Sequence, residues 1–362
     1  MKKKICFIIP SLRGGGAEKV IVNILRYINK SIFDITLIVI NKEGYYEKLL
    51  PKNITTLDLK RKKVRHSLPK LIKTLNIIRP DIVLSTQAHL NIGILLLKPF
   101  IMSNPKIIVR EANTPSISIS HLNHPKKEII TFLYKKLYKN ADLIIAQCED
   151  MKLDIVNFIK IPEEKIKVIY NPLDISSIKK EIDGRSPFQE GRVNFLSVGR
   201  LSFQKGFDIL LEAFKLVIEK VPIAHLTILG EGNLEENLKK QTVDLGINKH
   251  VTFEGFKESP YNHYYHSDTY VLSSRWEGFP NTLLEALACD TKVVATNCKS
   301  GPKEILLNNE YGLLAEVENP SSLAINMLKS LKIENRSKNR ASFYDIHKII
   351  KDYESVFHEL SS

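Results

Sequence analysis

Residues 270–288 read Tyr-Val-Leu-Ser-Ser-Arg-Trp-Glu-Gly-Phe-Pro-Asn-Thr-Leu-Leu-Glu-Ala-Leu-Ala, and this stretch decides the fold. The apolar run at 270–273 has the length of a buried strand, whereas 282–288 carries leucines and alanines at helical spacing. Gly278 and Pro280 interrupt the regular structure between the two segments. The stretch therefore predicts a strand, a short loop and a helix whose cap lies near Asn281.

The same alternation of strands and helices extends outward over the whole chain. Helices are expected at 17–27, 207–219 and 234–245 among others, each between two apolar runs. The expected strands are 4–9, 35–40, 81–85, 107–109, 143–146 and 167–170, then 193–198, 225–229, 251–254, 270–273 and 292–296. Repeated units of this kind predict parallel sheets covered by helices on both faces. Ligands bind such sheets at the carboxyl ends of the strands.

The length of 362 residues corresponds to two domains at roughly 150 residues each. Residues 171–192 are richer in Pro, Ser, Asp and Gly than their surroundings, which is typical of a linker. We therefore expect two doubly wound, Rossmann-like α/β domains at 1–170 and 193–340, facing an interdomain cleft. A final helical stretch at 341–362 could pack back on the first domain.

Cysteine usage and apolar runs indicate a cytoplasmic protein. The four cysteines lie too far apart for a zinc ribbon or a disulfide framework, which fits a reducing compartment. The apolar run behind Lys2 ends at Pro10 and is too short for a signal peptide. The longest apolar stretch, 92–102, is broken by Lys98 and Pro99, and a spanning helix needs about 20 residues.

Positive charge is concentrated in the first half of the chain. The net charge is +13, yet residues 1–180 hold 32 Lys and Arg against 15 Asp and Glu, so they alone carry +17. An excess of this size favours a polyanionic partner, either nucleic acid or an anionic membrane. The two densest clusters are Lys60, Arg61, Lys62, Lys63 and Arg65, and Lys126, Lys127, Lys135, Lys136 and Lys139.

The second basic cluster lies in segment 125–140, which can form a helix. That helix would place Ile129, Phe132, Leu133 and Leu137 on one side among the lysines, as in an interfacial membrane element. An ordinary Lys-rich surface helix is the alternative. Because we find no nucleic-acid-binding motif, we expect the basic domain to face an anionic membrane and no nucleic acid to bind.

Three glycine-containing loops follow predicted strands. The first, Gly14-Gly15-Gly16-Ala17-Glu18, opens a helix, so its backbone N–H groups could approach an anion. Its spacing matches neither the dinucleotide-binding fingerprint nor the P-loop, and a flexible turn is the alternative.

The second loop, residues 199–206, carries Arg200 and Lys205 between two glycines. Arginine can bind phosphate oxygens with two hydrogen bonds, and lysine supplies a compact point charge. Together they suit a leaving diphosphate, whose charge rises as its bond breaks. Two solvated cations in a loop are the alternative.

The third loop belongs to the opening stretch. Glu277 stands in the loop and Glu285 eight positions later on the helix, so the pair could accept hydrogen bonds from hydroxyls of a sugar and a ribose. The N–H groups of Gly278 and Phe279 would point into the same pocket. Glutamates also occur near helix starts simply because the helix dipole favours them.

Six motifs in this order resemble the bacterial retaining glycosyltransferases of family four, which have the GT-B fold. They are Gly-Gly-x-Glu at 15–18, Gly-Arg-Leu-x-x-x-Lys-Gly at 199–206, Gly-Glu-Gly at 230–232, Glu-Gly-Phe-Pro-x-x-Leu-Leu-Glu-Ala at 277–286, Gly-Pro-Lys-Glu-Ile-Leu at 301–306 and Tyr-Gly-Leu-Leu at 311–314. The resemblance spans nearly the whole chain. The form of the motif at 301–306 is similar to that of enzymes that build lipopolysaccharide, capsule or lipid-linked oligosaccharides.

The resemblance implies a role for each matching residue. Arg200, Lys205 and Glu277 would be the catalytic residues, with the two cations on the nucleotide diphosphate and Glu277 on the donor sugar. Glu285 would bind the ribose. The other donor-binding positions would be Gly15, Gly16, Gly199, Phe256, Gly278, Phe279, Pro280 and Asn281. Family members need no metal and no cofactor, because these cations replace the metal and the nucleotide sugar is a substrate.

One loop departs from the family pattern. Related enzymes often carry a histidine after the strand that corresponds to 107–109, but this chain reads Arg110-Glu111-Ala112-Asn113. Glu111 or Asn113 would then contact the donor or the acceptor.

The resemblance implies a retaining, metal-independent transfer from a UDP-hexose or UDP-N-acetylhexosamine to a lipid-linked glycan at the inner face of the cytoplasmic membrane. The leaving phosphate oxygen would take the proton of the acceptor hydroxyl, so no protein nucleophile is required. One alternative is a non-catalytic GT-B subunit of a transferase complex. Others are a GT-B sugar-nucleotide epimerase and a soluble glucan synthase, neither of which would need a basic first domain.

Overall fold

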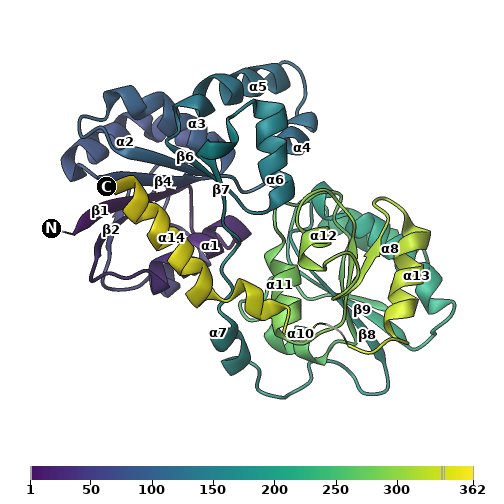
Figure 1. The fold of residues 1–362 in the computed structure, drawn as a ribbon. Helices are drawn as coiled ribbons and strands as arrows, with labels where there is room; N and C mark the ends of the chain where they lie inside the picture. The colour runs from purple at the N-terminus through teal and green to yellow at the C-terminus, as the bar shows by residue number, and fades with distance from the viewer. Residues whose placement is uncertain (1, 336, 338, 362) are drawn as a thin grey trace. The chain divides into compact units, whose positions relative to one another are not determined.

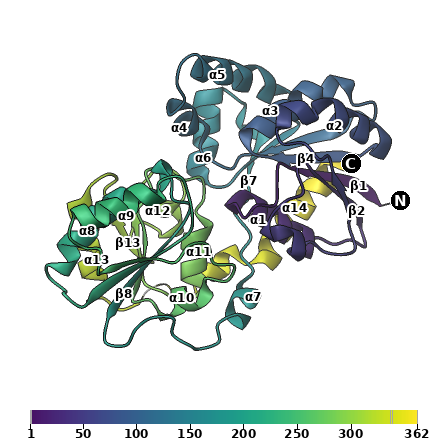
Figure 2. The same cartoon turned by 180° about the vertical axis from the view of Figure 1, so that it is seen from behind.

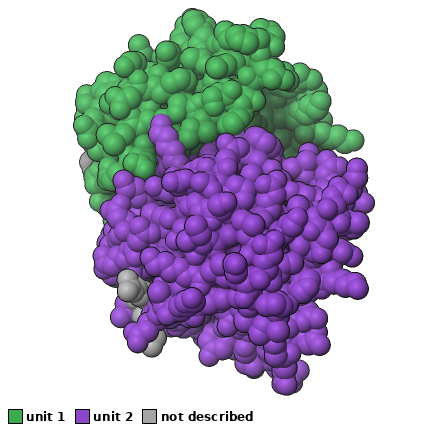
Figure 3. Space-filling model, turned by 90° about the vertical axis from the view of Figure 1, so that its right-hand side faces the viewer, with its two compact units in different colours: residues 1–172, 346–362 green, residues 173–345 purple. Residues whose placement is uncertain are grey.

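Two parallel β-sheets organise the chain, one in each of two units. The computed structural model describes residues 2–335, 337 and 339–361. Unit 1 consists of residues 1–172 together with 346–362, and unit 2 of residues 173–345 (Figure 3).

The sheet of unit 1 contains, in the described residues, seven parallel strands in the order β3-β2-β1-β4-β5-β6-β7. The strands are β1 Lys3–Ile9, β2 Phe33–Val39, β3 Thr55–Asp58, β4 Ile82–Thr86, β5 Lys106–Arg110, β6 Leu143–Ala146 and β7 Ile166–Val168. Most central positions are apolar on both faces, because helices cover the sheet on both sides.

Helices α2, α3 and α5 lie on one face of this sheet, and α1 and α14 lie on the other (Figures 1 and 2). The helices are α1 Gly16–Tyr27, α2 Val64–Ile78, α3 Ala88–Leu97, α4 Pro115–Ser120, α5 Lys126–Leu137, α6 Glu149–Asp154 and α14 Ile346–Ser361. Shorter helical turns are η1 Tyr45–Leu49, η2 Lys98–Phe100, η3 Tyr138–Asn140, η4 Ile155–Ile159 and η5 Glu163–Lys165.

The last helix, α14, completes the core of unit 1. The ring of Phe357 meets Phe7 edge-on at 6.0 Å and Phe33 at 5.8 Å between centroids. Tyr353 and Val356 are fully buried in the same cluster. The C-terminal segment therefore belongs physically to the first half of the chain, although residues 173–345 separate the two in sequence.

Unit 2 contains, in its described residues, six parallel strands in the order β10-β9-β8-β11-β12-β13. The strands are β8 Val193–Val198, β9 Ala224–Leu229, β10 Val251–Phe253, β11 Thr269–Leu272, β12 Val293–Thr296 and β13 Leu313–Ala315. The helices are α7 Ile175–Lys180, α8 Phe207–Ile218, α9 Glu235–Asp244, α10 Tyr261–His266, α11 Asn281–Ala288, α12 Pro302–Ile305 and α13 Pro320–Ser330, with η6 Phe203–Lys205 and η7 Ala341–Tyr344.

Local predictions differ from the structure at a few points. The helix cap was expected near Asn281, and it lies one residue earlier, at Pro280, so that α11 begins at Asn281. The expected linker 171–192 contains a helical turn, α7, whose Asp174 cap accepts a hydrogen bond from the N–H of Ser177. In the part of the chain that the structure describes, no helix is both long and apolar enough to cross a membrane.

Candidate functional site

The strand order of unit 2 reverses between β8 and β11. These two strands are neighbours, and the chain runs outward from them in opposite directions, to β9 and β10 on one side and to β12 and β13 on the other. Ligands of open parallel sheets bind in the crevice that such a reversal opens at the carboxyl edge. The loops that leave this edge are 199–206 and 273–280, so the topology brings the second and third sequence motifs together.

Loop 199–206 is shaped by close backbone approaches. Gly206 has a φ of +62°, and a Cβ atom at this position would lie 2.2 Å from the carbonyl oxygen of Ser273. Likewise, a Cβ on Gly230 would lie 2.0 Å from the carbonyl oxygen of Gly199. Only glycine fits at either place, so both glycines keep this loop close to its neighbours.

Lys205 and Glu277 form a salt bridge. The Lys205 ammonium lies 2.6 Å from Glu277 Oε1, and the hydroxyl of Ser274 donates to the same oxygen at 2.6 Å. The Glu277 side chain is only 6% exposed and that of Lys205 19%. This largely buried ion pair is preorganised before a ligand binds. Its cation could bind a phosphate, and its carboxylate could accept a hydrogen bond from a hydroxyl.

Glu285 is buried on α11, 5% exposed, where the phenol of Tyr264 lies 3.5 Å from its Oε2. The helix is held by a 2.8 Å hydrogen bond from the Tyr270 hydroxyl to Thr282. Because Glu285 stands on a helix that begins at the same edge as the two loops, the structure places both glutamates of the third motif at this site.

The remaining donor positions predicted in unit 2 lie along the same edge. Arg200 is exposed, Gly199 is half-buried, and Phe256 follows β10 with 46% of its surface exposed. The Phe279 ring is buried against Tyr344, so this ring packs in the interior of unit 2. Gly278 and Pro280 are buried, and Asn281 is half-buried.

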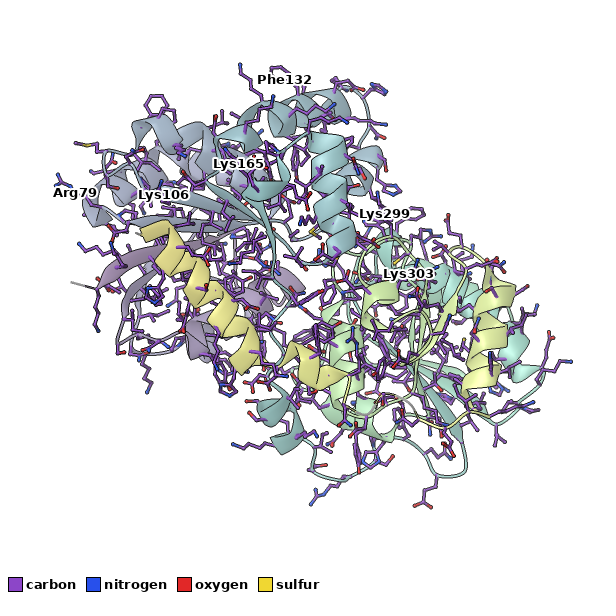
Figure 4. All side chains as sticks on the ribbon, viewed as in Figure 1. Arg79, Lys106, Phe132, Lys165, Lys299 and Lys303 are labelled. Carbon is purple, nitrogen blue, oxygen red and sulfur yellow. The ribbon has the colours of Figure 1, made fainter. Side chains whose placement is uncertain are left out.

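Three further features of this edge were not singled out as functional from the sequence. Lys299 and Lys303 are exposed after β12 and add positive charge (Figure 4). Ser274 fixes Glu277, and its carbonyl accepts from Thr296 at 2.5 Å. The bond between Thr296 and Ser274 joins residues 22 positions apart, so spacing alone gave no signal for it.

Cys298 also lies near Glu277. Burial, reinforced by the nearby Glu277 carboxylate, raises the pKa of the Cys298 thiol to about 12. A thiol with this pKa stays protonated at neutral pH, so Cys298 is a packing residue here and a poor nucleophile.

In unit 1 the strand order reverses between β1 and β4, and the first glycine motif follows β1. Gly15 is the N-cap of α1 and Gly16 its first residue. The carboxylate of Glu18 lies over this turn, 2.3 Å from where a Cβ on Gly15 would stand, and accepts from Ser11 at 3.2 Å. The glycine thus makes room for the glutamate of its own motif.

His89 lies in the first turn of α3, the helix that follows β4. Gln87 precedes α3 with a φ of +74°, a conformation that is rare for residues other than glycine. Burial lowers the pKa of His89, and the charge of Glu18 opposes that shift. From the sequence, His89 was not considered, because the family histidine was expected one strand later, after β5.

Glu111, expected to contact a substrate, lies inside a buried polar network. It is 1% exposed, and its carboxylate accepts hydrogen bonds from Tyr138, from Tyr134 at 3.3 Å and from Asn91 at 3.2 Å. Burial raises the pKa of Glu111 to about 7, against the opposing effect of these bonds. This placement favours a structural role for Glu111, whereas Asn113 is half-buried in the following loop.

The neighbouring Arg110 is fully buried and ties α14 to the sheet. Its guanidinium donates to the Tyr353 hydroxyl at 3.2 Å, to Thr86 at 3.4 Å and to the side chain of Asn171. These partners come from α14, β4 and the end of the first chain segment. Removing one partner of such a buried charge is strongly destabilising, because part of the charge is then left without compensation.

The basic clusters occupy the surface of unit 1. Lys60, Arg61, Lys62, Lys63 and Arg65 are exposed between β3 and the first turn of α2, and Lys126, Lys135, Lys136 and Lys139 are exposed on α5 and η3, with Lys127 half-buried. On α5, Ile129 is 53% and Phe132 60% exposed, and Figure 4 shows Phe132 projecting outward. Leu137 was expected on the same apolar side, and this is wrong, because it is buried beside Tyr134 in the interior.

Metal-ligating side chains do not gather at either edge. Within residues 2–335, 337 and 339–361, no group of three or more His, Cys, Asp or Glu side chains could hold a metal ion.

Comparison with known proteins agrees with this architecture. Residues 14–177 match Glycosyltransferase Family 4, and residues 178–345 match the Glycosyl transferases group 1. An uncharacterised glycosyltransferase of Methanocaldococcus jannaschii is 33% identical over 330 residues, which cover 78% of this chain and 80% of the relative. The N-acetylgalactosamine-N,N'-diacetylbacillosaminyl-diphospho-undecaprenol 4-alpha-N-acetylgalactosaminyltransferase of Campylobacter jejuni is 29% identical over 370 residues, with 97% of this chain and 98% of the relative covered.

Solved structures share the fold at low identity. Sucrose-phosphate synthase of Thermosynechococcus elongatus has a TM-score of 0.83 at 15% identity, and HepE of Anabaena in complex with UDP-glucose has 0.79 at 18%. The alignments cover 99% of both chains in the first case, and 98% of this chain and 99% of HepE in the second. The two units are thus the halves of a GT-B glycosyltransferase, as expected. This chain belongs to glycosyltransferase family four, and the resemblance seen in its motifs is confirmed.

Proposed function

We propose that this glycosyltransferase moves a sugar, with retention of configuration, from a UDP-sugar to a membrane-lipid-linked glycan in bacterial surface glycoconjugate synthesis. The observation that carries the proposal is the Lys205–Glu277 pair at the carboxyl edge of unit 2, where the strand order reverses. A fixed cation beside a fixed carboxylate suits a molecule that has a diphosphate next to a polyhydroxylated ring.

The donor assignment rests on the chemistry of this edge. Lys205 and Arg200 would neutralise the diphosphate, Glu277 and the backbone around Phe279 would hold the sugar, and Glu285 would bind the ribose. Structural neighbours with the same fold contain UDP-glucose or UDP, namely HepE of Anabaena and TarM of Staphylococcus aureus. Their identities of 18% and 14% support the fold alone, so UDP is our inference for this chain.

The proposed reaction needs no protein nucleophile. The bond between the anomeric carbon and the phosphate oxygen breaks, and the acceptor oxygen bonds to the same face of that carbon. The acceptor proton goes to the departing phosphate oxygen. Arg200 and Lys205 stabilise the charge that grows on the diphosphate, which is the part a metal ion plays in other transferases. We therefore propose a metal-independent enzyme without a cofactor.

The acceptor assignment rests on two relatives that cover nearly the whole chain. Both Campylobacter jejuni enzymes are named for N-acetylgalactosamine transfer to undecaprenol diphosphate-linked sugars, at 29% and 25% identity. We extend the class of acceptor, a glycan on a polyprenyl diphosphate, to this chain. A UDP-N-acetylhexosamine is accordingly the first donor to test.

A lipid-linked acceptor implies contact with a membrane, and unit 1 offers the surface for it. Exposed Ile129 and Phe132 stand among the lysines of α5. A second apolar patch consists of Ile77, Phe100 and Met102, which are 73%, 66% and 74% exposed. Asn76 joins its two segments through hydrogen bonds with the backbone of Phe100 and Met102. Apolar side chains ringed by cations match an anionic bilayer surface.

Nucleotide release tests the proposal directly. UDP-, GDP- and ADP-sugars are incubated with polyprenyl diphosphate-linked glycans, and nucleotide and glycolipid are measured together for the wild type, Arg200→Ala and Glu277→Gln. We expect release from a UDP-sugar that needs the lipid-linked acceptor and is lost in both variants. Release without an acceptor would favour a hydrolase or an epimerase. No release and no UDP binding would favour a non-catalytic subunit and overturn the proposal.

A further inference from the structure

Arg275 connects three separate segments of unit 2. Its guanidinium forms two hydrogen bonds with Asp208 at 2.9 and 2.6 Å, one with Glu318 at 2.8 Å and one with the carbonyl of Phe203 at 2.8 Å. The same group lies 3.9 Å from the centre of the Phe203 ring. The Arg275 side chain is 9% exposed, against 38% and 58% for its two acidic partners. Arg275 is therefore the sheltered centre of this cluster.

Two of the segments that Arg275 connects are the loops of the candidate site. Phe203 lies in loop 199–206, two positions before Lys205, and Arg275 itself lies two positions before Glu277. The backbone joins the loops as well, because the N–H of Arg275 donates to Gln204 at 2.8 Å and the Gln204 side chain donates to the carbonyl of Trp276 at 3.0 Å. Asp208, at the start of α8, accepts two hydrogen bonds from the guanidinium.

We propose that Arg275 is a positioning residue that holds the two loops together and thereby sets Lys205 against Glu277 for donor binding. The inference deepens the proposed function and rests on it. No contact between Arg275 and the donor is required, because its hydrogen-bonding groups point to Asp208, Glu318 and Phe203. Its effect on the donor is transmitted through the loops.

The geometry requires arginine at this position. A planar guanidinium can bind one carboxylate with two hydrogen bonds, a second carboxylate through Nε and a carbonyl at the same time, while stacking on an aromatic ring. A lysine would supply the charge without that fixed set of directions. Arg275→Lys should therefore retain part of the Asp208 attraction and lose the link to Phe203, whereas Arg275→Gln should lose both.

The position of the loops can be measured without any substrate, because Trp276 is the single tryptophan of the chain. Its ring lies 6.0 Å from that of Phe203. Acrylamide quenching of its fluorescence is compared among the wild type, Arg275→Gln, Arg275→Lys and the matched control Arg185→Gln. We expect quenching to increase in Arg275→Gln, to a lesser extent in Arg275→Lys and hardly at all in the control, since Arg185 is an exposed arginine outside the Arg275 cluster.

UDP binding by calorimetry tests the second half of the inference. We expect Arg275→Gln to weaken UDP binding about tenfold, a loss of about 1.4 kcal/mol. When Lys205 is already replaced by alanine, Arg275→Gln should weaken UDP binding much less, because the effects of two residues that act through one another do not add. If Arg275 were purely structural, Arg275→Gln would lower the melting temperature and leave the UDP affinity of the folded protein unchanged.

The outcomes separate this inference from the proposed function. Unchanged Trp276 quenching in Arg275→Gln, or full additivity with Lys205→Ala, overturns the positioning role. A wild type that binds no UDP contradicts the proposed donor, while the quenching comparison still decides whether Arg275 holds the loops.

Discussion

The Lys205 ammonium lies 2.6 Å from Glu277 Oε1, across 72 positions of sequence, with the Glu277 side chain almost wholly shielded from solvent. Ser274 donates to the same oxygen. The two residues proposed to meet the donor phosphate and the donor sugar thus stabilise each other before any ligand arrives. Removing one partner leaves a charge in a place where water cannot fully solvate it.

Lys205→Ala should therefore destabilise the protein as well as weaken donor binding. An uncompensated buried carboxylate costs about 3 kcal/mol or somewhat less where solvent reaches it. In the double variant Lys205→Ala/Glu277→Ala the stranded charge is gone, so part of the stability should return. Urea unfolding of the wild type, both single variants and the double variant measures this coupling. If the loss of stability in the double variant equals the sum of the losses in the two single variants, Lys205 and Glu277 do not stabilise each other, which would contradict this prediction.

The stability of unit 1 should fall as pH rises, because of Glu111. Burial raises the pKa of this carboxyl from 4.5 to about 7, so the folded state holds its proton more tightly than the unfolded chain does. The stabilisation is complete below pH 4.5 and is lost as pH rises through about 7. Glu111→Gln keeps an uncharged group that can accept the Tyr134 and Tyr138 hydrogen bonds.

The check on Glu111 is a series of unfolding experiments from pH 4 to pH 9. The wild type should lose roughly 3 kcal/mol over this range relative to Glu111→Gln, with contributions from other groups cancelling in the difference. Parallel pH profiles for the two proteins would show that Glu111 ionises normally in the fold.

The C-terminal helix should be indispensable for unit 1. Phe357 is completely buried between Phe7, Phe33 and Tyr353, so Phe357→Ala leaves a cavity and should cost about 3 to 5 kcal/mol. Phe343, which is 50% exposed, is the matched control, and Phe343→Ala should cost much less. Thermal unfolding measures both variants. Similar losses would mean that α14 packs only loosely on the sheet.

Binding to anionic vesicles should depend on the apolar side chains of unit 1. Phe132→Ser and the pair Ile77→Ser/Phe100→Ser should reduce sedimentation with phosphatidylglycerol vesicles, because each change removes apolar surface that would enter the interface. Ile325→Ser on α13, 63% exposed in unit 2, is the control and should bind as the wild type does. Added salt should weaken binding, since lysines provide the attraction.

Either of two vesicle results would contradict the membrane proposal. One is equal binding to neutral and anionic vesicles, and the other is an equal effect of Ile325→Ser and Phe132→Ser. If the variants of only one patch lose vesicle binding, that patch is the one that contacts the membrane.

Sequence patterns predicted the sheets well because buried parallel strands are continuous apolar runs. The strands at 193–198 and 143–146 coincide with β8 and β6 to the residue. Strand β3, Thr55–Asp58, was missed, since it lies at the sheet edge with two threonines and an aspartate. Strand β13, with three residues, is too short for any period to be visible.

The site could be predicted only as far as its loops. Family motifs led to Lys205 and Glu277, but their mutual bond depends on β8 and β11 being neighbours. The same holds for Glu111, whose partners Asn91 and Tyr138 lie 20 and 27 positions away. From the sequence, a charged residue directly after a strand is expected to be exposed. Only the fold shows that the side chains of Asn91, Tyr134 and Tyr138 enclose Glu111.

UDP binding to the wild type and to Lys205→Ala is the most direct test of the central claim that the edge of unit 2 binds a nucleoside diphosphate. Lys220→Ala, an exposed cation just beyond the other end of α8, is the control. Calorimetry should give a saturable isotherm for the wild type and the control, and an affinity about a hundredfold lower for Lys205→Ala. Equal affinities for all three proteins, or no UDP binding by the wild type, would contradict the account.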